Sequence, residues 1–253
     1  MKISVITICY NSAHSIGDAI QSVLAQTYPN VEYIVVDGKS KDTTVEVIKS
    51  FGSGISKFVS EPDKGIYDAL NKGIKMATGD VIGFMHSDDL YANNEILTKV
   101  AALFEKEKTD SVYGDLEYVY KDDTSKVLRY WKSGAFSIPK LRMGWMPPHP
   151  TFYVKREVYE KYGLFNINLK ISADYDTMLR FLGKHHITTA YLPEVMVRMR
   201  VGGASNRSLK NIIRKSKEDY QAIKDNSFGS IFTLIFKNLR KITQFIAKDK
   251  KTN

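Results

Sequence analysis

Cysteine is nearly absent from this chain of 253 residues, in which Cys9 is the only one. A lone cysteine excludes an intrachain disulfide and favours a reducing compartment. The residues around it do not form the pattern of a nucleophile with a histidine base. We therefore interpret Cys9 as a small, buried hydrophobic side chain.

Extended apolar stretches are also missing from the sequence. No stretch of about 18 apolar residues is available to span a membrane. Residues 1–2 lead directly into a strand-like segment rather than into the apolar region of a signal peptide. The sequence has no repeats and no low-complexity linker. It predicts a cytoplasmic protein with one domain of residues 1–205, followed by a helical tail of residues 206–253.

Positively charged residues outnumber negatively charged ones in this sequence. The formal net charge is +9, and Lys and Arg are dense in residues 206–253. This balance favours anionic partners such as nucleic acid, anionic lipid or phosphorylated small molecules. The chain lacks zinc-finger spacing and the aromatic-basic pattern of a single-strand RNA platform, so we expect no nucleic acid among its partners.

The first 90 residues alternate between apolar runs and amphipathic segments. The runs are typical of buried parallel strands, and the segments between them place apolar residues at helical spacing. Strands alternating with helices of about 10 residues predict an α/β fold, with a Rossmann-like, mostly parallel sheet flanked by helices. The strands are expected at residues 3–10, 31–36, 55–59 and 81–85, and the helices at residues 16–27, 42–51 and 66–76.

Beyond residue 94 the alternation is less regular. We expect, in order, a helix, three strands and two further helices before the tail. These occupy residues 95–106, 111–119, 126–131, 151–154, 156–162 and 172–182.

Acidic residues end two of the early strands. Asp37 follows the second run, and His86-Ser87-Asp88-Asp89 follows the fourth. Ligands of open α/β sheets bind outside the carboxyl ends of the strands. Carboxylates at that place must be solvated, paired or bound to a cation. We therefore predict a crevice that takes a nucleotide diphosphate together with a divalent metal.

Five stretches, in this order, resemble the family-2 glycosyltransferases, which adopt the GT-A fold. The resemblance covers roughly residues 1–205 and implies a glycosyltransferase of the hexosyltransferase type. Residues 1–90 would bind the nucleotide sugar, and residues 91–205 would form the acceptor and catalytic half. The last two stretches resemble the enzymes that build bacterial O-antigen or capsular polysaccharide. The stretches are ISVITICYNS (3–12), IQSVLAQTY (20–28), VVDGKSKDTT (35–44), PPHPTF (147–152) and SADYD (172–176).

The resemblance implies a UDP-sugar donor held by six residues at the strand ends, in the loop before the third helix and in that helix: Thr7, Tyr10, Asp37, Lys64, Asn71 and Ser87. Asp37 would contact the uracil or ribose, Tyr10 would help to cradle the base, and Lys64 would approach a phosphate as a point charge. Ordinary structural roles stay open for each of them. Tyr10 also fits a core aromatic, Lys64 a solvated surface lysine, and Asn71 a polar face of the helix.

The resemblance also implies Mn²⁺ or Mg²⁺ bound by Asp88, with Asp89 as a second ligand or as a helix cap. Asp174 would be the general base of an inverting transfer, because an aspartate is ionised at neutral pH and ready to accept a proton. Asp176 is the rival base, and a helix start enriched in acidic residues explains either one without catalysis. The side chains considered for the acceptor pocket are Trp145, His149 and Tyr175.

Two positions depart from the family pattern. His86 stands at the first acidic position of the usual Asp-x-Asp, and Ala173 stands where relatives often carry Glu. Both keep open a non-catalytic module that binds a nucleotide sugar or a membrane. A nucleotidyltransferase is a further alternative, but residues 11–14 are not the Gly- and Arg-rich phosphate loop that it would need.

The tail carries an amphipathic pattern. In residues 228–248, apolar residues recur at helical spacing with Lys and Arg among them, including Lys237. Such a helix binds an anionic membrane surface with about 1 kcal/mol per basic residue. The acceptor implied by the resemblance is a glycan or a polyprenyl-diphosphate-linked saccharide, which suits a location on the inner face of the cytoplasmic membrane. Packing on the catalytic domain or on a second subunit would bury the same apolar stripe.

Overall fold

The computed structural model describes residues 1–201 and 209–246, with side chains except those of residues 209–210 and 240–246. Within these ranges the strands form one nine-stranded sheet. The strands are β1 (Ile3–Cys9), β2 (Val31–Asp37), β3 (Lys57–Ser60), β4 (Val81–Phe84), β5 (Leu90–Tyr91), β6 (Ser111–Val119), β7 (Val127–Trp131), β8 (Tyr153–Lys155) and β9 (Thr189–Arg200).

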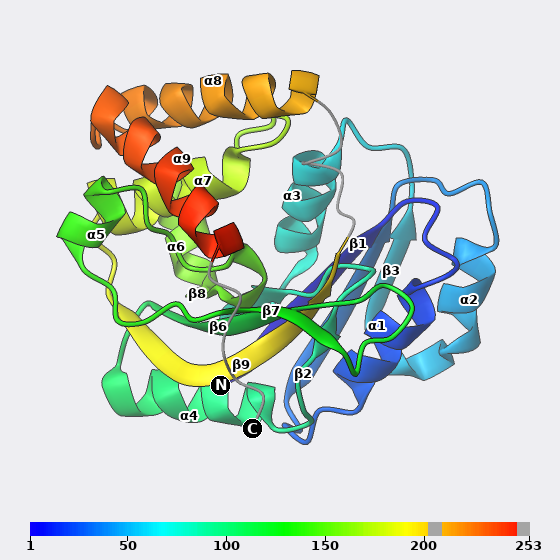
Figure 1. Ribbon diagram of the computed structural model, residues 1–253. Helices are drawn as coiled ribbons and strands as arrows, with labels where there is room; N and C mark the ends of the chain where they lie inside the picture. The colour runs from blue at the N-terminus through cyan, green and yellow to red at the C-terminus, as the bar shows by residue number, and fades with distance from the viewer. Residues whose placement is uncertain (202–208, 247–253) are drawn as a thin grey trace.

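Helices connect the strands and cover both faces of the sheet (Figure 1). The α-helices are α1 (Ile16–Leu24), α2 (Thr44–Ser50), α3 (Ile66–Met76), α4 (Ile96–Glu107), α5 (Ile138–Arg142), α6 (Arg156–Tyr162), α7 (Ala173–Met178), α8 (Leu209–Asp225) and α9 (Ile231–Ile246). A π-helical segment, η3 (Leu179–Lys184), continues α7, and two short 3₁₀ turns are η1 (Gly52–Gly54) and η2 (His149–Thr151).

The strand order is β3-β2-β1-β4-β8-β6-β9-β5, with β7 paired to β6. The first four strands in this order are parallel. β8 then joins β4 and β6 antiparallel to both, and β9 runs parallel to β6. The sheet is therefore mixed and mostly parallel, which confirms the predicted α/β fold class.

Two apolar cores lie on opposite faces of the sheet. Since successive side chains of a strand point to opposite faces, Ile3 and Val5 join the core under α1 and α4, whereas Ile6 and Ile8 join the core under α3 and α7. Burial on both sides explains why the central strands are continuous apolar runs.

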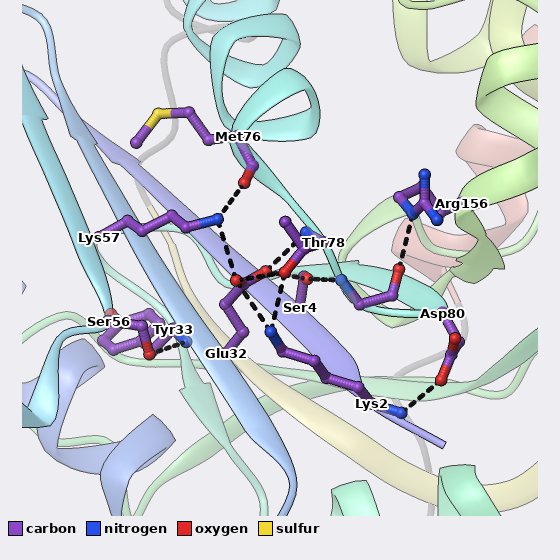
Figure 2. Close-up of polar contacts among 11 residues, drawn as sticks. Lys2, Ser4, Glu32, Tyr33, Ser56, Lys57, Met76, Thr78, Asp80 and Arg156 are labelled. Atoms are coloured by element: carbon purple, nitrogen blue, oxygen red, sulfur yellow. Dashed lines mark hydrogen bonds and ion pairs between the residues drawn. The ribbon is translucent and has the colours of Figure 1, made fainter.

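The amino ends of the first strands are joined by a polar network around Glu32, opposite to the end at which Asp37 lies (Figure 2). The carboxylate of Glu32 forms ion pairs with Lys2 and Lys57, and it accepts hydrogen bonds from Ser4 and Thr78. The network thus fixes three strands and the turn after α3 relative to one another.

The two C-terminal helices pack directly on the second half of the sheet domain, where Figure 1 shows α9 crossing near α5 and α7. A Cβ added at Gly144, whose φ is +75°, would lie 2.6 Å from the Cα of Lys237, and one added at Gly183 would lie 2.8 Å from the Phe228 ring. Only glycine permits an approach this close. The predicted boundary at residue 205 lies outside the described residues.

Most predicted elements are found within a few residues of their expected bounds. Among the strands and α-helices, three were not predicted: β5, α5 and β9. Both α8 and α9 lie within the tail that was predicted to be helical. β9 contains Pro193 and several charged residues, and its side chains are mostly half-buried, so it carries no apolar run. Its pairing with β6 is decided by distant contacts rather than by local pattern.

Candidate active site

Asp37 ends β2 at the carboxyl edge of the sheet, as predicted. Its side chain is fully buried. It accepts hydrogen bonds from the Ser40 amide at 3.0 Å, from the Ser40 hydroxyl, and from the Ser60 hydroxyl at 2.6 Å. These bonds satisfy the buried carboxylate and fix the turn that follows the strand.

Asp88 and Asp89 follow β4 in one turn, but their side chains lie in different environments. Asp88 is half-buried, and none of the described residues donates a hydrogen bond to its carboxylate. Asp89 is buried and accepts from the Arg200 amide at 3.2 Å, while its other carboxylate oxygen has no partner among the described residues. Burial, followed by the charge of Asp88, raises the pKa of Asp89 well above its ordinary value. Asp88 is therefore the better placed carboxylate for a ligand.

Arg200 at the end of β9 fastens this turn. Its guanidinium donates to the Asp88 carbonyl at 3.1 Å and forms an ion pair with Asp18 at 2.6 Å. The sequence carried no local signal for this role, because Arg200 and Asp18 are brought together only by the pairing of β9 in the sheet. Ser87 in the same turn donates to the Ser12 hydroxyl at 3.1 Å.

Asp174 lies in the first turn of α7 and is half-buried. The Tyr67 hydroxyl from α3 lies 3.4 Å from the carboxylate of Asp174 and donates to the Ile171 carbonyl at 2.7 Å. Asp176 is buried instead, where it pairs with Arg180 at 2.9 Å and accepts from Asn226 at 2.7 Å. Of the two candidate bases, Asp174 alone is partly open to a substrate.

His86 and His149 lie close to each other in the candidate site. The rings of His86 and His149 lie 5.8 Å apart. Burial lowers the pKa of His86, and the charges of Asp88 and Asp174 both act against that shift. Burial lowers the pKa of His149 to about 4, again against the charge of Asp174. The charges of Asp88 and Asp174 therefore both act on the imidazole of His86, although the two aspartates are far apart in sequence.

The remaining predicted donor residues lie in different environments. Tyr10 is 56% exposed, and Lys64 is exposed in the loop before α3. Thr7 is buried and accepts from the Tyr33 hydroxyl at 3.0 Å. Asn71 uses both polar atoms of its amide on the backbone of Phe165, each at 2.9 Å. The structure thus gives Thr7 and Asn71 structural bonds, and their contact with a nucleotide stays a prediction.

The aromatic candidates for an acceptor pocket are largely buried. The Trp145 indole donates to the Ser133 carbonyl at 3.0 Å, which gives it a structural role. The His149 Nε2 atom and the Tyr175 hydroxyl are buried without a hydrogen-bond partner among the described residues. Of the three, only His149 combines a half-buried ring with an unused polar atom beside Asp174.

Lys237 is buried, whereas the tail pattern grouped it with surface cations. It forms an ion pair with Asp219 at 2.7 Å, and its Nζ atom lies 3.2 Å from the centre of the Tyr175 ring. Burial lowers the pKa of Lys237 to about 8. The residue after Asp174 is therefore packed directly against the C-terminal helices.

Metal ligands are sparse in the part of the chain that the structure describes. It contains no group of three or more His, Cys, Asp or Glu side chains arranged to hold a metal ion. The half-buried carboxylate of Asp88 fits a different arrangement, in which Mg²⁺ or Mn²⁺ takes one or two carboxylates together with substrate phosphates.

Two relatives found by sequence are named as glycosyltransferases. An uncharacterised glycosyltransferase of Rickettsia typhi is 34% identical over 230 residues, which cover 87% of this chain and 70% of that protein. A PGL/p-HBAD biosynthesis glycosyltransferase of Mycobacterium bovis is 28% identical over 208 residues, covering 80% and 78% of the two chains.

Solved structures share the architecture at low identity. Residues 1–349 of TarS from S. aureus give a TM-score of 0.70 at 18% identity, over 100% of this chain and 76% of that one. The chain covers 44% of a longer TarS structure. The mannosyltransferase PcManGT of Pyrobaculum calidifontis, solved with GDP-Man and Mn²⁺, gives 0.61 at 16% identity, over 98% and 76% of the two chains. These likenesses confirm the predicted GT-A fold.

The sequence model of glycosyl transferase family 2 matches residues 4–174. That range is more than half of the chain, and it includes both the turn of Asp88 and the start of the helix that carries Asp174. The chain is a glycosyltransferase and belongs to glycosyl transferase family 2.

Proposed function

We propose that the protein is an inverting, metal-dependent enzyme that transfers a sugar from a UDP-sugar to a hydroxyl group of a glycan or lipid-linked oligosaccharide. The observation that carries this proposal is that two half-buried carboxylates, Asp88 and Asp174, both act electrostatically on His86, whose ring lies 5.8 Å from the ring of the half-buried His149. One carboxylate follows a parallel strand at its carboxyl end, where sheets of this kind bind ligands. The other begins a helix of the second half.

The donor would lie over residues 1–90. Asp37, Tyr10, Lys64 and Ser87 are at the ends of β2, β1, β3 and β4 or in the loops that follow them. Asp88 would hold Mn²⁺ or Mg²⁺, with Asp89 behind it. When bound, the ion would act as a Lewis acid on the departing diphosphate. Solved structural neighbours were determined with UDP-GlcNAc and with GDP-Man and Mn²⁺, which supports a nucleotide sugar and a divalent ion.

Asp174 would act on the acceptor, which we place in the half of residues 91–205. Its carboxylate accepts the proton of the acceptor hydroxyl while that oxygen bonds to the anomeric carbon. The bond from the anomeric carbon to the diphosphate breaks on the opposite face, UDP leaves, and the configuration inverts. The neutral rings of His86 and His149 would line this space, with the free Nε2 atom of His149 available to a sugar hydroxyl.

Release of UDP from a panel of UDP-sugars tests this proposal. We expect slow hydrolysis of one donor with Mn²⁺, lost with EDTA and lowered at least about 100-fold in Asp88→Asn and Asp174→Asn. Asp122→Asn is a matched control, because this aspartate is exposed in the turn between β6 and β7. Release that is insensitive to EDTA and to Asp88→Asn would refute the metal role. UDP binding by calorimetry without any release would favour a binding module.

The outer face of α9 supports a location at a membrane. Among the described side chains of residues 231–239, Thr233 and Lys237 are buried and Leu234 packs half-buried against the core, whereas five large apolar side chains are exposed. Phe232 is 65% exposed. The five are Ile231, Phe232, Ile235, Phe236 and Leu239. No helix of the described ranges is long and apolar enough to cross a bilayer.

The charge of the tail sequence also favours a location at an anionic membrane. Residues 206–253 contain twelve Lys and Arg but only four Asp and Glu. An exposed apolar helix face within a strongly basic stretch of sequence is typical of proteins that bind anionic lipid at the interface. We propose peripheral binding to the cytoplasmic membrane, where an acceptor on polyprenyl diphosphate for O-antigen or capsule assembly would be reached.

Co-sedimentation with vesicles tests the membrane surface. We expect binding to vesicles with anionic lipid and much weaker binding to neutral ones, with a loss of at least about 10-fold in the double variant Phe232→Ser/Ile235→Ser. Leu128→Ser, at an exposed leucine of β7, is the control. Equal binding of the double variant would contradict the proposal, and a change in oligomeric state instead would assign the face to a second copy.

A further inference from the structure

Glu218 of α8 contacts the segment that leads into the proposed catalytic base. One oxygen of its carboxylate accepts three consecutive backbone N–H groups: Lys170 at 3.0 Å, Ile171 at 2.7 Å and Ser172 at 3.1 Å. Successive N–H groups that converge in this way form a natural site for an anion. Here a side chain of the same chain occupies it.

These amides lie directly before the helix that carries the proposed base. Ser172 is the residue before α7, and Asp174 is the second residue of that helix. The Ser172 hydroxyl also donates to the Lys215 carbonyl of α8 at 3.4 Å. On the other side, Tyr67 of α3 donates to the Ile171 carbonyl at 2.7 Å. The segment before the base is therefore held between α8 and α3.

A second contact, made by the residue that follows α8, lies just after the base. Asn226 donates to Asp176 at 2.7 Å, and Asp219 pairs with Lys237 beneath Tyr175. Residues on both sides of Asp174 are thus held by α8, by the residue that follows it and by α9. This helix lies beyond residues 4–174, which the family model matches, so the family resemblance assigns no role to it.

We infer that Glu218 is a positioning residue for catalysis, which holds Asp174 in line with the acceptor by gathering the amides of residues 170–172. The inference rests on the proposed function, because it takes Asp174 as the base. Its energetic origin is the strength of hydrogen bonds to a charged acceptor. The importance of such positioning is that a misplacement of about 1 Å costs about 100-fold in rate.

Two substitutions separate positioning from general stability. Glu218→Ala removes the acceptor, whereas Glu218→Gln keeps one oxygen that still accepts. We expect kcat for UDP release to fall about 100-fold in Glu218→Ala and about 10-fold in Glu218→Gln. The Kd for UDP should stay within about twofold of the wild type, since the donor half does not contact α8 in the proposed arrangement. Asp225→Asn, at an exposed aspartate of the same helix, is the matched control.

Amide hydrogen exchange supplies the structural readout. In Glu218→Ala the peptide containing residues 170–172 should exchange faster than in the wild type, because three N–H groups lose their acceptor. Faster exchange with kcat unchanged from Asp225→Asn would overturn the inference, as would unchanged exchange. A parallel loss of UDP affinity and kcat would assign Glu218 to stability alone. A wild-type protein that releases UDP from no donor would instead refute the proposed function.

Discussion

Replacement of Glu32 by Gln is expected to destabilise the protein without touching the active site. Glu32 is 4% exposed at the amino end of the sheet, opposite the edge where Asp37 and Asp88 lie. Its carboxylate accepts from Ser4 at 2.7 Å and from the amide and hydroxyl of Thr78 at 2.8 and 2.7 Å. Figure 2 shows these bonds meeting at one side chain.

The size of this destabilisation can be worked out from the groups that bind the charged carboxylate of Glu32. Hydrogen bonds to a charged acceptor contribute about 1.5–3 kcal/mol each, and the amide oxygen of Gln retains part of this. Lys2 and Lys57 lie 3.1 and 3.0 Å from the carboxylate, but their side chains are 37% and 35% exposed. Each of these ion pairs therefore contributes less than about 1 kcal/mol. We expect Glu32→Gln to lower the free energy of unfolding by about 3 kcal/mol, or the melting temperature by roughly 6–12 °C.

The same network predicts how the loss depends on pH. Burial alone would raise the pKa of Glu32, but the hydrogen bonds from Thr78, Ser4 and Lys57 outweigh it and hold the pKa well below its usual range. A carboxylate whose pKa is depressed in the folded state stabilises that state fully when the pH is above the pKa of the same group in the unfolded chain. For glutamate that unfolded pKa is about 4.3. That stabilisation is lost as pH falls further, because the unfolded state takes up the proton first.

Urea unfolding at pH 7 and at about pH 3.5 measures both effects, with Glu46→Gln at an exposed glutamate of α2 as the control. The difference between wild type and Glu32→Gln should be largest at pH 7 and should narrow at the lower pH. A difference below about 1 kcal/mol at pH 7 would refute the reasoning. So would a difference that is the same at both pH values.

Two further substitutions test the packing around the site. Gly83→Ala in β4 would place a Cβ 2.1 Å from the fully buried Tyr153 ring, so we expect the free energy of unfolding to fall by about 1–3 kcal/mol in thermal unfolding. Gly17→Ala in α1 is the control, because its Cβ would lie 3.6 Å from the nearest side chain, and it should be neutral or stabilising. Lys237→Met would leave the buried carboxylate of Asp219 unpaired, at a cost of about 3–5 kcal/mol in urea unfolding, and the double change with Asp219→Leu should recover most of it. Failure of the double change to recover stability would show that Lys237 acts through packing alone.

Local pattern was sufficient for the first half of the fold. The apolar runs of β1, β2 and β4 and the helical spacing of α3 are properties of neighbouring residues, since a strand or helix buried on known faces imposes its period on the sequence. The position of Asp37 and Asp88 at strand ends followed from the same reading. The predicted bounds of α3 and β6 agree with the structure.

The second half depends on long-range pairing. β9 has no apolar run, yet it joins the sheet beside β6 and brings Arg200 to the turn of Asp88. The tail pattern identified an amphipathic helix, but its orientation is decided by Asp219, which draws Lys237 inward. A buried cation is stable only with a partner of opposite charge, and that partner lies 18 residues away on another helix.

The fold class, the family and the acidic residues that end the early strands could all be predicted from the sequence, because each depends on short stretches with a local physical period. Which of the neighbouring carboxylates stay partly open, and which are buried with structural partners, depends on the tertiary structure. Asp88 and Asp174 both act on His86, whereas Asp89 and Asp176 are buried with other partners. The choice among neighbouring aspartates is a matter of solvent access and hydrogen-bond supply, and both are set by elements remote in the chain.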